Sequence, residues 1–292
     1  GFKIQDSKDV VMYQLKAEWL GEPDSANGAY GLYPVSCENL LVDGCESYGA
    51  SDAGIYVGQS KHVIVRNCRA ERNVAGIEIE NTLDADVYNN VATNNTGGIL
   101  IFDLPGLPQP KGGRINVFDN KANDNNYRNF APKGNIVASI PAGTGSFVLC
   151  CSDVRIYNNE IKNNRTNNTA ITDWEVTQKP ADDPDFKKIP DGISIHGNDF
   201  AQNPEHSPDT SIFMGKAVKM ISEQFDVQPD IIWTGVQNNG LIQDDGTMKQ
   251  EDKICVGANG GAQYFNLRTG AKTREQVNCK LEPFPRQDLQ HL

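Results

Sequence analysis

The chain of 292 residues has no long apolar run, few aromatic residues and no excess of positive charge. A membrane-spanning helix needs about 18 or more consecutive apolar residues, and no run in this sequence approaches that length. Lys and Arg number 27 against 38 Asp and Glu, which gives a formal net charge of −11. Such a surface would repel nucleic-acid phosphates and anionic lipids, so we expect no nucleic-acid partner and no membrane span.

Leader and cofactor motifs are also missing. No Met-led, basic and apolar leader opens the chain, so we expect any export signal to lie outside it. None of the seven cysteines forms a CxxC motif, which excludes a zinc ribbon and a haem attachment site, and no nucleotide motif is present. Cys255 and Cys279 lie in a polar C-terminal stretch, and we predict a disulfide between them, which would indicate an oxidising compartment. The pairing of the others stays open: Cys37, Cys45, Cys68, Cys150 and Cys151.

Asparagine and glycine are abundant instead, with 29 and 27 copies. Both residues disfavour long helices and favour tight turns. Aromatic residues make up only 8% of the chain. The composition therefore predicts a turn-rich β protein.

Two short motifs repeat along the chain in the same phase. The first alternates apolar and variable residues and recurs at spacings of 22 or 23 residues over its internal copies, Gly31–Pro34, Gly54–Val57, Gly76–Ile79 and Gly98–Ile101, with a further copy at Gly1–Ile4. The second ends in Asn or Cys and recurs at Leu40–Cys45, Val63–Cys68, Ala85–Asn90, Ile115–Asn120, Val154–Asn159 and Ile193–Asn198. Alternation of this kind is typical of half-buried strands, and a period of 22 is too short for a propeller blade.

The repeat predicts an all-β fold, a right-handed parallel β-helix of about seven rungs. In this register Ile55, Val57, Ile77 and Ile79 point inward, while the turns stack Asn residues into a ladder of buried hydrogen bonds. Two turn positions carry cysteine in place of asparagine. We interpret Cys45 and Cys68 as buried apolar fillers, with a disulfide between the rungs as the alternative.

The repeat extends over residues 1–203, and residues 204–292 are expected to form an irregular C-terminal cap. A short helix is predicted from Ser211 to Phe225 within this cap. Inserted loops interrupt the repeat at residues 18–30, 103–113, 121–144 and 172–191. Because Gly1 begins directly in a strand, we expect a missing segment or a partner to cover the N-terminal rung.

The repeats resemble the parallel β-helix proteins, an architecture shared by pectate lyases, polygalacturonases and mannuronan C5-epimerases. Three segments resemble one secreted bacterial family of β-helix repeat proteins of unknown function, often paired with a secreted cytochrome-like protein: Asn27–Pro34, Gly49–Gly58 and Asn129–Val137. The resemblance covers nearly the whole chain and implies a secreted or periplasmic location. The Asp-Pro-His-Asp motif of the epimerases is absent, and His196–Asp199 has a different spacing. The resemblance therefore implies no catalytic residue.

Function in a β-helix lies on outward positions walled by inserted loops. Glu78 and Glu80 are two positions apart on one predicted strand, so both point outward at the floor of a predicted cleft. Paired carboxylates can perform acid–base catalysis or hold Ca²⁺. The predicted catalytic residues are Glu78, Glu80 and Lys133, the predicted sugar-binding residues are Tyr33, Tyr56 and Asp103, and the predicted Ca²⁺ ligands are Glu78, Glu80 and Asp103, with Asp52 at the edge of the cleft.

Each of these residues has a plainer interpretation. The glutamates could be solvated and face Arg66, Arg69 or Arg72, Lys133 could be a solvated loop residue, and the tyrosines could form an aromatic ladder. His196 belongs to the other sheet, where we expect it to stack on Tyr157.

The sequence is compatible with two functions. The first is an exported carbohydrate-active protein that acts on an acidic polysaccharide as a lyase or C5-epimerase. The second is a non-catalytic envelope module that docks a partner, such as a secreted redox protein. A lyase should place a basic residue over the carboxylates, whereas a docking module should expose a broad apolar patch on one sheet.

Overall fold

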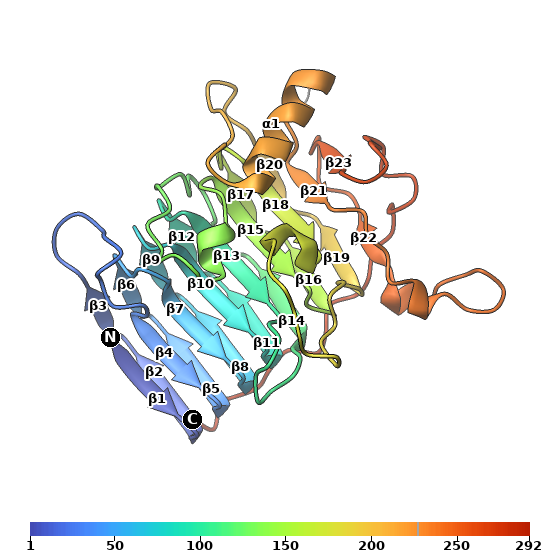
Figure 1. The fold of residues 1–292 in the computed structure, drawn as a ribbon. Helices are drawn as coiled ribbons and strands as arrows, with labels where there is room; N and C mark the ends of the chain where they lie inside the picture. The colour runs from blue at the N-terminus through green and yellow to red at the C-terminus, as the bar shows by residue number, and fades with distance from the viewer. Residues whose placement is uncertain (227) are drawn as a thin grey trace.

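The computed structural model describes residues 1–226 and 228–292, and its strands stack into a parallel β-helix (Figure 1). Sheet A contains nine parallel strands: β1 (Phe2–Gln5), β4 (Leu32–Val35), β7 (Ala53–Gly58), β10 (Ala75–Glu80), β13 (Gly97–Phe102), β15 (Thr144–Leu149), β18 (Asn167–Thr172), β21 (Ile231–Trp233) and β23 (Tyr264–Asn266). The predicted fold is confirmed.

Sheets B and C complete the rungs. Sheet B contains β2 (Lys8–Tyr13), β5 (Glu38–Asp43), β8 (Lys61–Arg66), β11 (Leu83–Tyr88), β14 (Gly113–Phe118), β16 (Val154–Tyr157), β19 (Ile193–His196) and β22 (Ile254–Val256). Sheet C is shorter, with β3 (Lys16–Glu18), β6 (Glu46–Tyr48), β9 (Arg69–Glu71) and β12 (Val91–Thr93). The pair β17 (Glu160–Lys162) and β20 (Asp199–Ala201) continues it through bridges at Lys121.

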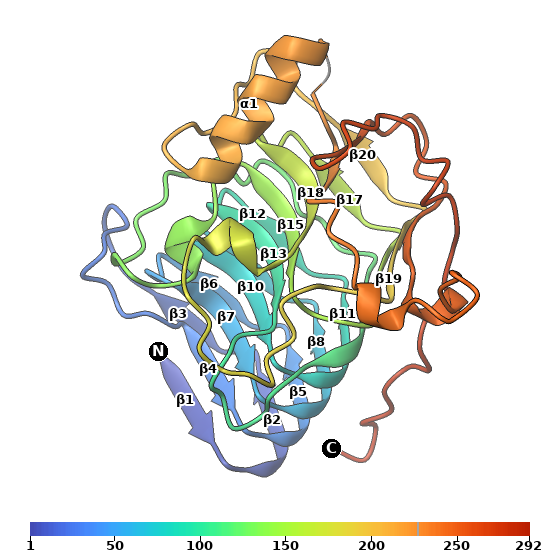
Figure 2. The same cartoon turned by 45° about the vertical axis from the view of Figure 1, so that its right-hand side comes forward.

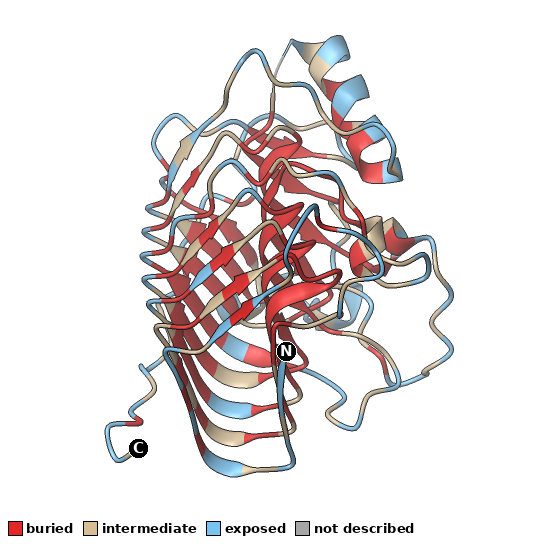
Figure 3. Ribbon diagram, turned by 90° about the vertical axis from the view of Figure 1, so that its left-hand side faces the viewer, coloured by how far each residue is buried: buried red, intermediate tan, exposed pale blue. Residues whose placement is uncertain are grey.

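The apolar positions of the repeat form one continuous core between the sheets. Ile55, Ile77 and Ile99 are directly paired in register along sheet A and are almost wholly buried. Val65, Val87 and Val117 do the same in sheet B. The burial pattern agrees, because the strands of the central rungs are buried while the first rung and the turns are more exposed (Figure 3). The predicted inward positions are confirmed.

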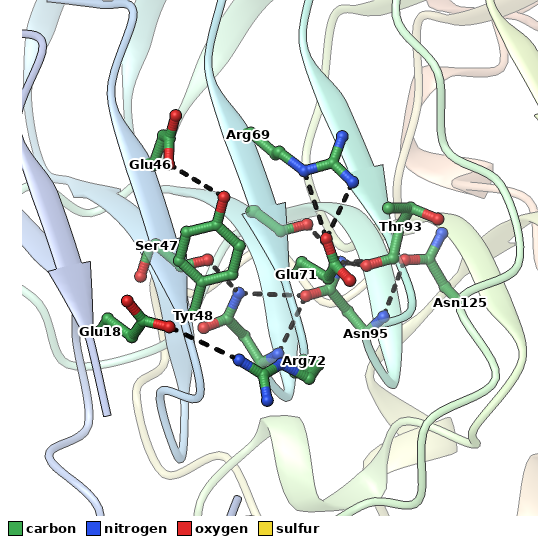
Figure 4. Close-up of polar contacts among 12 residues, drawn as sticks. Glu18, Glu46, Ser47, Tyr48, Arg69, Glu71, Arg72, Thr93, Asn95 and Asn125 are labelled. Carbon is green, nitrogen blue, oxygen red and sulfur yellow. Dashed lines mark hydrogen bonds and ion pairs between the residues drawn. The ribbon is translucent and has the colours of Figure 1, made fainter. Parts of the chain in front are cut away.

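Asparagine ladders satisfy the polar groups at two turns of each rung. In the predicted ladder, the side-chain amide of Asn90 donates to Asn120 Oδ1, Asn120 donates to Asn159, and the chain continues through Asn198 to Asn259. The residue before each of the first four positions has a positive φ, for example Asn89 and Asp119, a conformation that Asn and Asp tolerate best among residues other than Gly. A second ladder, which the sequence analysis missed, contains Asn73, Asn95, Asn125, Asn164 and Asn168 (Figure 4 shows Asn95 and Asn125).

The solenoid continues beyond residue 203, where the sequence repeat fades. The strands β21, β22 and β23 stack on the preceding rungs, although their sequences no longer follow the motif. The predicted short helix is present as α1 (Phe213–Phe225) and lies over this end of the molecule (Figure 1). The remaining helical turns are η1 (Val137–Ser139), η2 (Trp174–Thr177), η3 (Asn239–Leu241) and η4 (Gln250–Asp252). No helix among the residues described is long and apolar enough to cross a membrane.

The predicted disulfide between Cys255 and Cys279 is formed. The other five cysteines are free thiols and all are buried. Cys45 and Cys68 both belong to the core between the sheets, as expected of apolar fillers. The alternative of a disulfide between their rungs is therefore wrong for this structure.

The C-terminal tail, residues 280–292, runs back along the outer face of sheet B toward the N-terminal rungs (Figure 2). It covers a stack of parallel rings in which neighbouring centroids lie 5.0 to 5.5 Å apart: Tyr88, Phe118, Tyr157 and His196. His196 therefore stacks on Tyr157, as predicted. The guanidinium of Arg286 lies 4.0 Å from the Phe118 ring centroid, and its Nε donates to Asp86 Oδ2 at 2.8 Å.

The inserted loops gather over the outer face of sheet A. Phe130, Val137, Trp174 and Phe186 pack from these loops, together with residues of α1, onto the outward side chains of β13, β15 and β18. The outward side chains there, Leu100, Phe102, Phe147 and Leu149, are consequently buried in a second apolar core. Over β7 and β10 this face instead carries Tyr56, Glu78 and Glu80 beneath the loops.

Candidate functional site

The two glutamates of β10 occupy the polar part of this face. Alternation along the strand turns Ile77 and Ile79 into the core, so Glu78 and Glu80 point outward. In the register of sheet A, Glu78 lies between Tyr56 and Leu100, and Glu80 lies between Gly58 and Phe102. Outward does not mean solvated here, because Glu78 is 3% exposed and Glu80 is 7% exposed.

The solvated interpretation of this pair is therefore wrong. The arginines that would have faced the glutamates pair elsewhere: Arg66 with Asp43, Arg69 with Glu71, and Arg72 with Glu18 (the last two in Figure 4). The reason is topological, since these arginines lie at the end of sheet B or in sheet C and its following turn, while β10 belongs to sheet A.

The glutamates line a pocket of about 270 Å³ under the longest inserted loop. The loop forms one wall, and Asn135 Nδ2 donates to Asp52 Oδ2 at 2.8 Å. Lys179, from residues 172–191, donates to the carbonyl oxygens of Gly134 and Asn135 and so anchors this wall. The lining residues are Tyr30, Asp52, Glu78, Glu80, Leu104, Gly134, Asn135, Ile136 and Val137. Three of them are acidic and none is basic.

Burial is the main cause of the raised pKa values of the acidic residues in this pocket. Loss of hydration raises the pKa of Asp52 to about 6 and that of Glu80 to about 7. The pKa of Glu78 is raised well above its ordinary value by burial first, and then by the negative charges of Asp52 and Glu80. The side chains of Glu78 and Glu80 also influence each other's pKa. Among the residues described, no N–H or O–H donor reaches Glu78 Oε2.

Three tyrosines pack against one another beside the site, and one of them, Tyr30, lines the pocket. The ring centroids of Tyr30, Tyr33 and Tyr56 lie between 4.5 and 5.0 Å from one another. The Tyr56 hydroxyl donates to Glu80 Oε1 at 2.5 Å, and this bond opposes the rise in the pKa of Glu80. Tyr33 and Tyr56 thus lie beside the glutamates, as expected. Tyr30 and Asn135 were not predicted as site residues. Both lie in inserted loops, where the repeat does not indicate in which direction a side chain points.

Asp103 and Lys133 lie apart from the lining of the pocket. Asp103 is 2% exposed, and its Oδ1 accepts a hydrogen bond from the Gly112 amide at 2.8 Å, which closes the 103–113 loop. Burial raises the pKa of Asp103 to about 7. Lys133 is exposed on the outer side of the loop that contains Gly134, and it forms no ion pair within residues 1–226 and 228–292.

The acidic residues do not fit a calcium site. Ca²⁺ takes six to eight oxygen ligands. In the part of the chain that the structure describes, no group of three or more His, Cys, Asp or Glu side chains is arranged to hold a metal ion. Asp103 already accepts a hydrogen bond from the Gly112 amide and does not line the pocket that contains the two glutamates. We therefore derive no chemical step through a metal.

Comparison with known proteins identifies the family to which this fold belongs. The family model described as a right-handed β-helix region matches residues 1–203. No curated protein sequence gives a significant match. Among solved structures, the A-module of the mannuronan C-5 epimerase AlgE4 from Azotobacter vinelandii is similar, with 15% identity, a TM-score of 0.51, and coverage of 86% of this chain and 59% of that one.

Two further structures are similar at lower scores. The A-module of the mannuronan C-5 epimerase AlgE6 from the same organism has 14% identity and a TM-score of 0.44, with coverage of 88% and 60%. A DFA-IIIase from Arthrobacter chlorophenolicus A6, solved in complex with GF2, has 12% identity and a TM-score of 0.42, with coverage of 88% and 56%. The chain thus spans less than two thirds of each of these structures. The matched residues, the stacked sheets and the two core ladders together show that this chain belongs to the right-handed β-helix family.

Proposed function

We propose that the protein is a carbohydrate-active enzyme that uses the carboxyls of the pocket as its acid and base. The proposal rests on the gathering of three buried acidic residues, Asp52, Glu78 and Glu80, in one pocket that Tyr30 also lines. The architecture is one that a mannuronan epimerase module shares, which supports a polysaccharide substrate. Fold alone does not select a reaction, so the chemistry is argued from the site.

The acidities divide the roles between the carboxyls. Asp52 loses its proton near pH 6, whereas Glu80, with a pKa of about 7 and paired with Glu78, keeps one at that pH. Between these two pH values Asp52 is a carboxylate while Glu80 is a carboxylic acid. Cleavage of a glycosidic bond needs this combination: the acid protonates the leaving oxygen, and the carboxylate activates water or stabilises the positive charge that develops on the sugar.

Lyase or epimerase chemistry on a uronate receives less support from the same site. Removal of the C5 proton needs a positive group to neutralise the uronate, and the pocket lining has neither Lys, Arg nor His. Lys133, the predicted partner of a sugar carboxylate, lies outside this lining. Acid–base cleavage requires no such cation, so the arrangement favours it.

The docking alternative also receives less support. It predicts a broad apolar patch on one sheet, but the loops and the C-terminal tail cover both sheets over the central rungs. Phe118 of sheet B, for example, is 3% exposed. The disulfide supports an exported location for either function.

The test is a screen of uncharged, cationic and uronate polysaccharides at about pH 6.5, where the acid and the carboxylate coexist. Cleavage should appear as new reducing ends, whereas a lyase would create unsaturated ends that absorb in the ultraviolet. The same assays with EDTA test the predicted dependence on Ca²⁺.

Variants then locate the activity. Glu80→Gln and Asp52→Asn should each lower kcat at least a hundredfold, because each removes one partner of the acid–base pair. The matched control is Glu71→Gln, which changes a half-buried glutamate of sheet C that pairs with Arg69, and it should keep full activity. Full activity in Glu80→Gln would sink the proposal.

A further inference from the structure

The pocket has a pronounced charge imbalance that the proposed chemistry does not use. Its lining contains Asp52, Glu78 and Glu80, and no lining side chain carries a positive charge. The surrounding protein adds to this potential, since the chain has a formal net charge of −11. Low-dielectric walls around charges of one sign concentrate ions of the opposite sign. Once these carboxyls ionise, for which the pKa values of Asp52 and Glu80 are about 6 and about 7, the pocket attracts cations and repels uronates.

One acceptor within the pocket has no protein partner. Glu78 is 3% exposed and lines the pocket, yet its Oε2 receives no hydrogen bond from the residues described. Buried polar atoms are nearly always satisfied, and leaving one unpaired costs about 1–3 kcal/mol. A ligand with several N–H donors would satisfy this oxygen, and an ammonium group carries three.

The cluster of three tyrosines suits a cation as well as a sugar ring. Tyr30 lines the pocket and stacks on Tyr33 at 4.5 Å, so electron-rich ring faces border the carboxyls. The ammonium of Lys3 already lies 5.2 Å from the Tyr33 ring centroid, which shows that this aromatic group accepts a positive charge. An inorganic ion is not favoured, because the carboxyls do not form a metal-binding group in the described part of the chain.

From these observations we propose that the pocket recognises a sugar with a free, protonated amine, as in glucosamine polymers. The ammonium contacts Glu78 and Glu80, and the sugar ring lies toward Tyr30. This inference rests on the proposed carbohydrate function, because the same carboxyls would also bind an amine outside a sugar. Recognition and cleavage are nevertheless separate properties, and they can be measured separately.

The first experiment measures binding to the intact protein by calorimetry at about pH 6.5, where the pocket carboxyls are partly ionised. A glucosamine tetrasaccharide is compared with its fully N-acetylated form and with a galacturonate tetrasaccharide. We expect the glucosamine oligomer to bind at least tenfold more tightly than either. Added salt should weaken only this interaction, because only it pairs opposite charges. Equal affinity for the N-acetylated form, or tighter binding of the galacturonate, would overturn the inference.

A second comparison separates the amine from the sugar. A simple diamine should bind at least tenfold more weakly than the glucosamine tetrasaccharide, and equal affinities would overturn the assignment to a sugar. Glu80→Gln should weaken glucosamine binding about tenfold, while Glu71→Gln should leave it unchanged. The comparison of the three sugars on the unaltered protein needs no variant, so a folding defect in Glu80→Gln does not affect it.

Turnover distinguishes this inference from the proposed function. Tight glucosamine binding without cleavage would support the ligand class and contradict the catalytic role. Cleavage of an uncharged polysaccharide, with no preference for the free amine in binding, would support the catalytic role and overturn the ligand class.

Discussion

Glu80 is held between opposing influences on its pKa. Burial raises it to about 7, and the negative charge of Asp52 acts in the same direction. The Tyr56 hydroxyl and the side chain of Glu78 stabilise the carboxylate form of Glu80 and act against this rise. The acidity of the proposed acid is therefore adjustable by changes that leave Glu80 itself in place.

Tyr56→Phe removes the hydroxyl that donates to Glu80 Oε1. Without this hydrogen bond the pKa of Glu80 should rise by about 1 unit, equivalent to about 1.4 kcal/mol. The alkaline limb of the pH–rate profile should move to higher pH by the same amount. Tyr48→Phe is a matched control, because Tyr48 donates to Glu46 in sheet C. An unmoved alkaline limb in Tyr56→Phe would contradict the assignment of Glu80 as the acid.

The raised pKa values of Glu78 and Glu80 also predict how the stability of the protein depends on pH. Glu78 and Glu80 keep protons in the folded protein at pH values where the unfolded chain has already released them, so the free energy of unfolding should fall as pH rises from about 4.5 to above 7. Glu78→Gln removes one of these buried acids. We expect this variant to gain about 1–3 kcal/mol at pH 8 and little at pH 4.

Urea denaturation at both pH values measures this difference. Glu71→Gln reports the effect of losing a half-buried carboxylate that is paired with Arg69, and it should show no such gain. If both variants lost stability with pH as steeply as the parent protein, the buried acids would not be the cause. A stabilised but inactive Glu78→Gln would fit the usual opposition between stability and function at active sites.

The turns of the solenoid depend on side chains that act in series. Each ladder asparagine accepts from the backbone amide and the side-chain amide of the preceding rung and donates to the following one, as Asn120 does between Asn90 and Asn159. These hydrogen bonds are buried, so an interruption leaves several groups unsatisfied at once. The ladder therefore adds side-chain hydrogen bonds between neighbouring rungs to those of the strand pairing.

Asn120→Ala should lower the free energy of unfolding by about 2–4 kcal/mol, because it leaves the backbone amide of Asn90 and one of its two side-chain N–H groups without an acceptor. Asn239→Ala, at an exposed position in η3, should change stability by less than about 0.5 kcal/mol. Urea midpoints of the two variants provide the measurement. A loss in Asn120→Ala no larger than in Asn239→Ala would show that the ladder contributes nothing to stability.

The C-terminal tail joins rungs that are far apart in the sequence. Its starting point is fixed by the disulfide at Cys279, and its contacts reach Asp86, in the fourth strand of sheet B. Asp86 is fully buried and accepts from Asn116 Nδ2, from Arg286 Nε and from the Gln287 amide. Loss of the tail would consequently expose or strand a charge in the middle of the molecule.

Arg286→Ala should destabilise the protein by about 1–3 kcal/mol, since it removes the charged partner of Asp86 and the ring contact with Phe118. Lys280 lies on the same tail and forms an exposed ion pair with Glu282. Lys280→Ala should therefore lower the free energy of unfolding by less than about 1 kcal/mol. Thermal unfolding compares the two. Equal losses would mean that the tail is held by its backbone alone.

Reduction of the disulfide tests the same arrangement from its other end. The Cys255–Cys279 bond closes a loop of 24 residues in sequence separation, for which chain entropy predicts about 3 kcal/mol of stabilisation. We expect dithiothreitol to lower the unfolding temperature of the parent protein and to have no effect on the double variant Cys255→Ser/Cys279→Ser. Identical melting curves for oxidised and reduced protein would contradict this role.

The repeat by itself determined the β-helix, the register of Ile55, Ile77 and Ile99, and the outward direction of Glu78 and Glu80, because strand alternation and rung stacking are local and periodic. The ladder through Asn90 was also predictable, and the Asn73 ladder carried a similar signal. The sequence repeat ends near residue 203, whereas β21 to β23 continue the stack. Backbone hydrogen bonds at the edge of a sheet do not depend on the repeat motif, so apolar strands without the motif can pair there.

Tertiary structure alone decided how the site is enclosed. Loops outside the repeat brought Tyr30 and Asn135 to the glutamates, sealed the neighbouring face with apolar side chains, and left Lys133 outside the pocket. Burial, and therefore the raised pKa values of Asp52 and Glu80, depends on what lies above the strand. A pattern of alternation specifies only the strand, so the chemistry of the pocket appears only once the loops are in place.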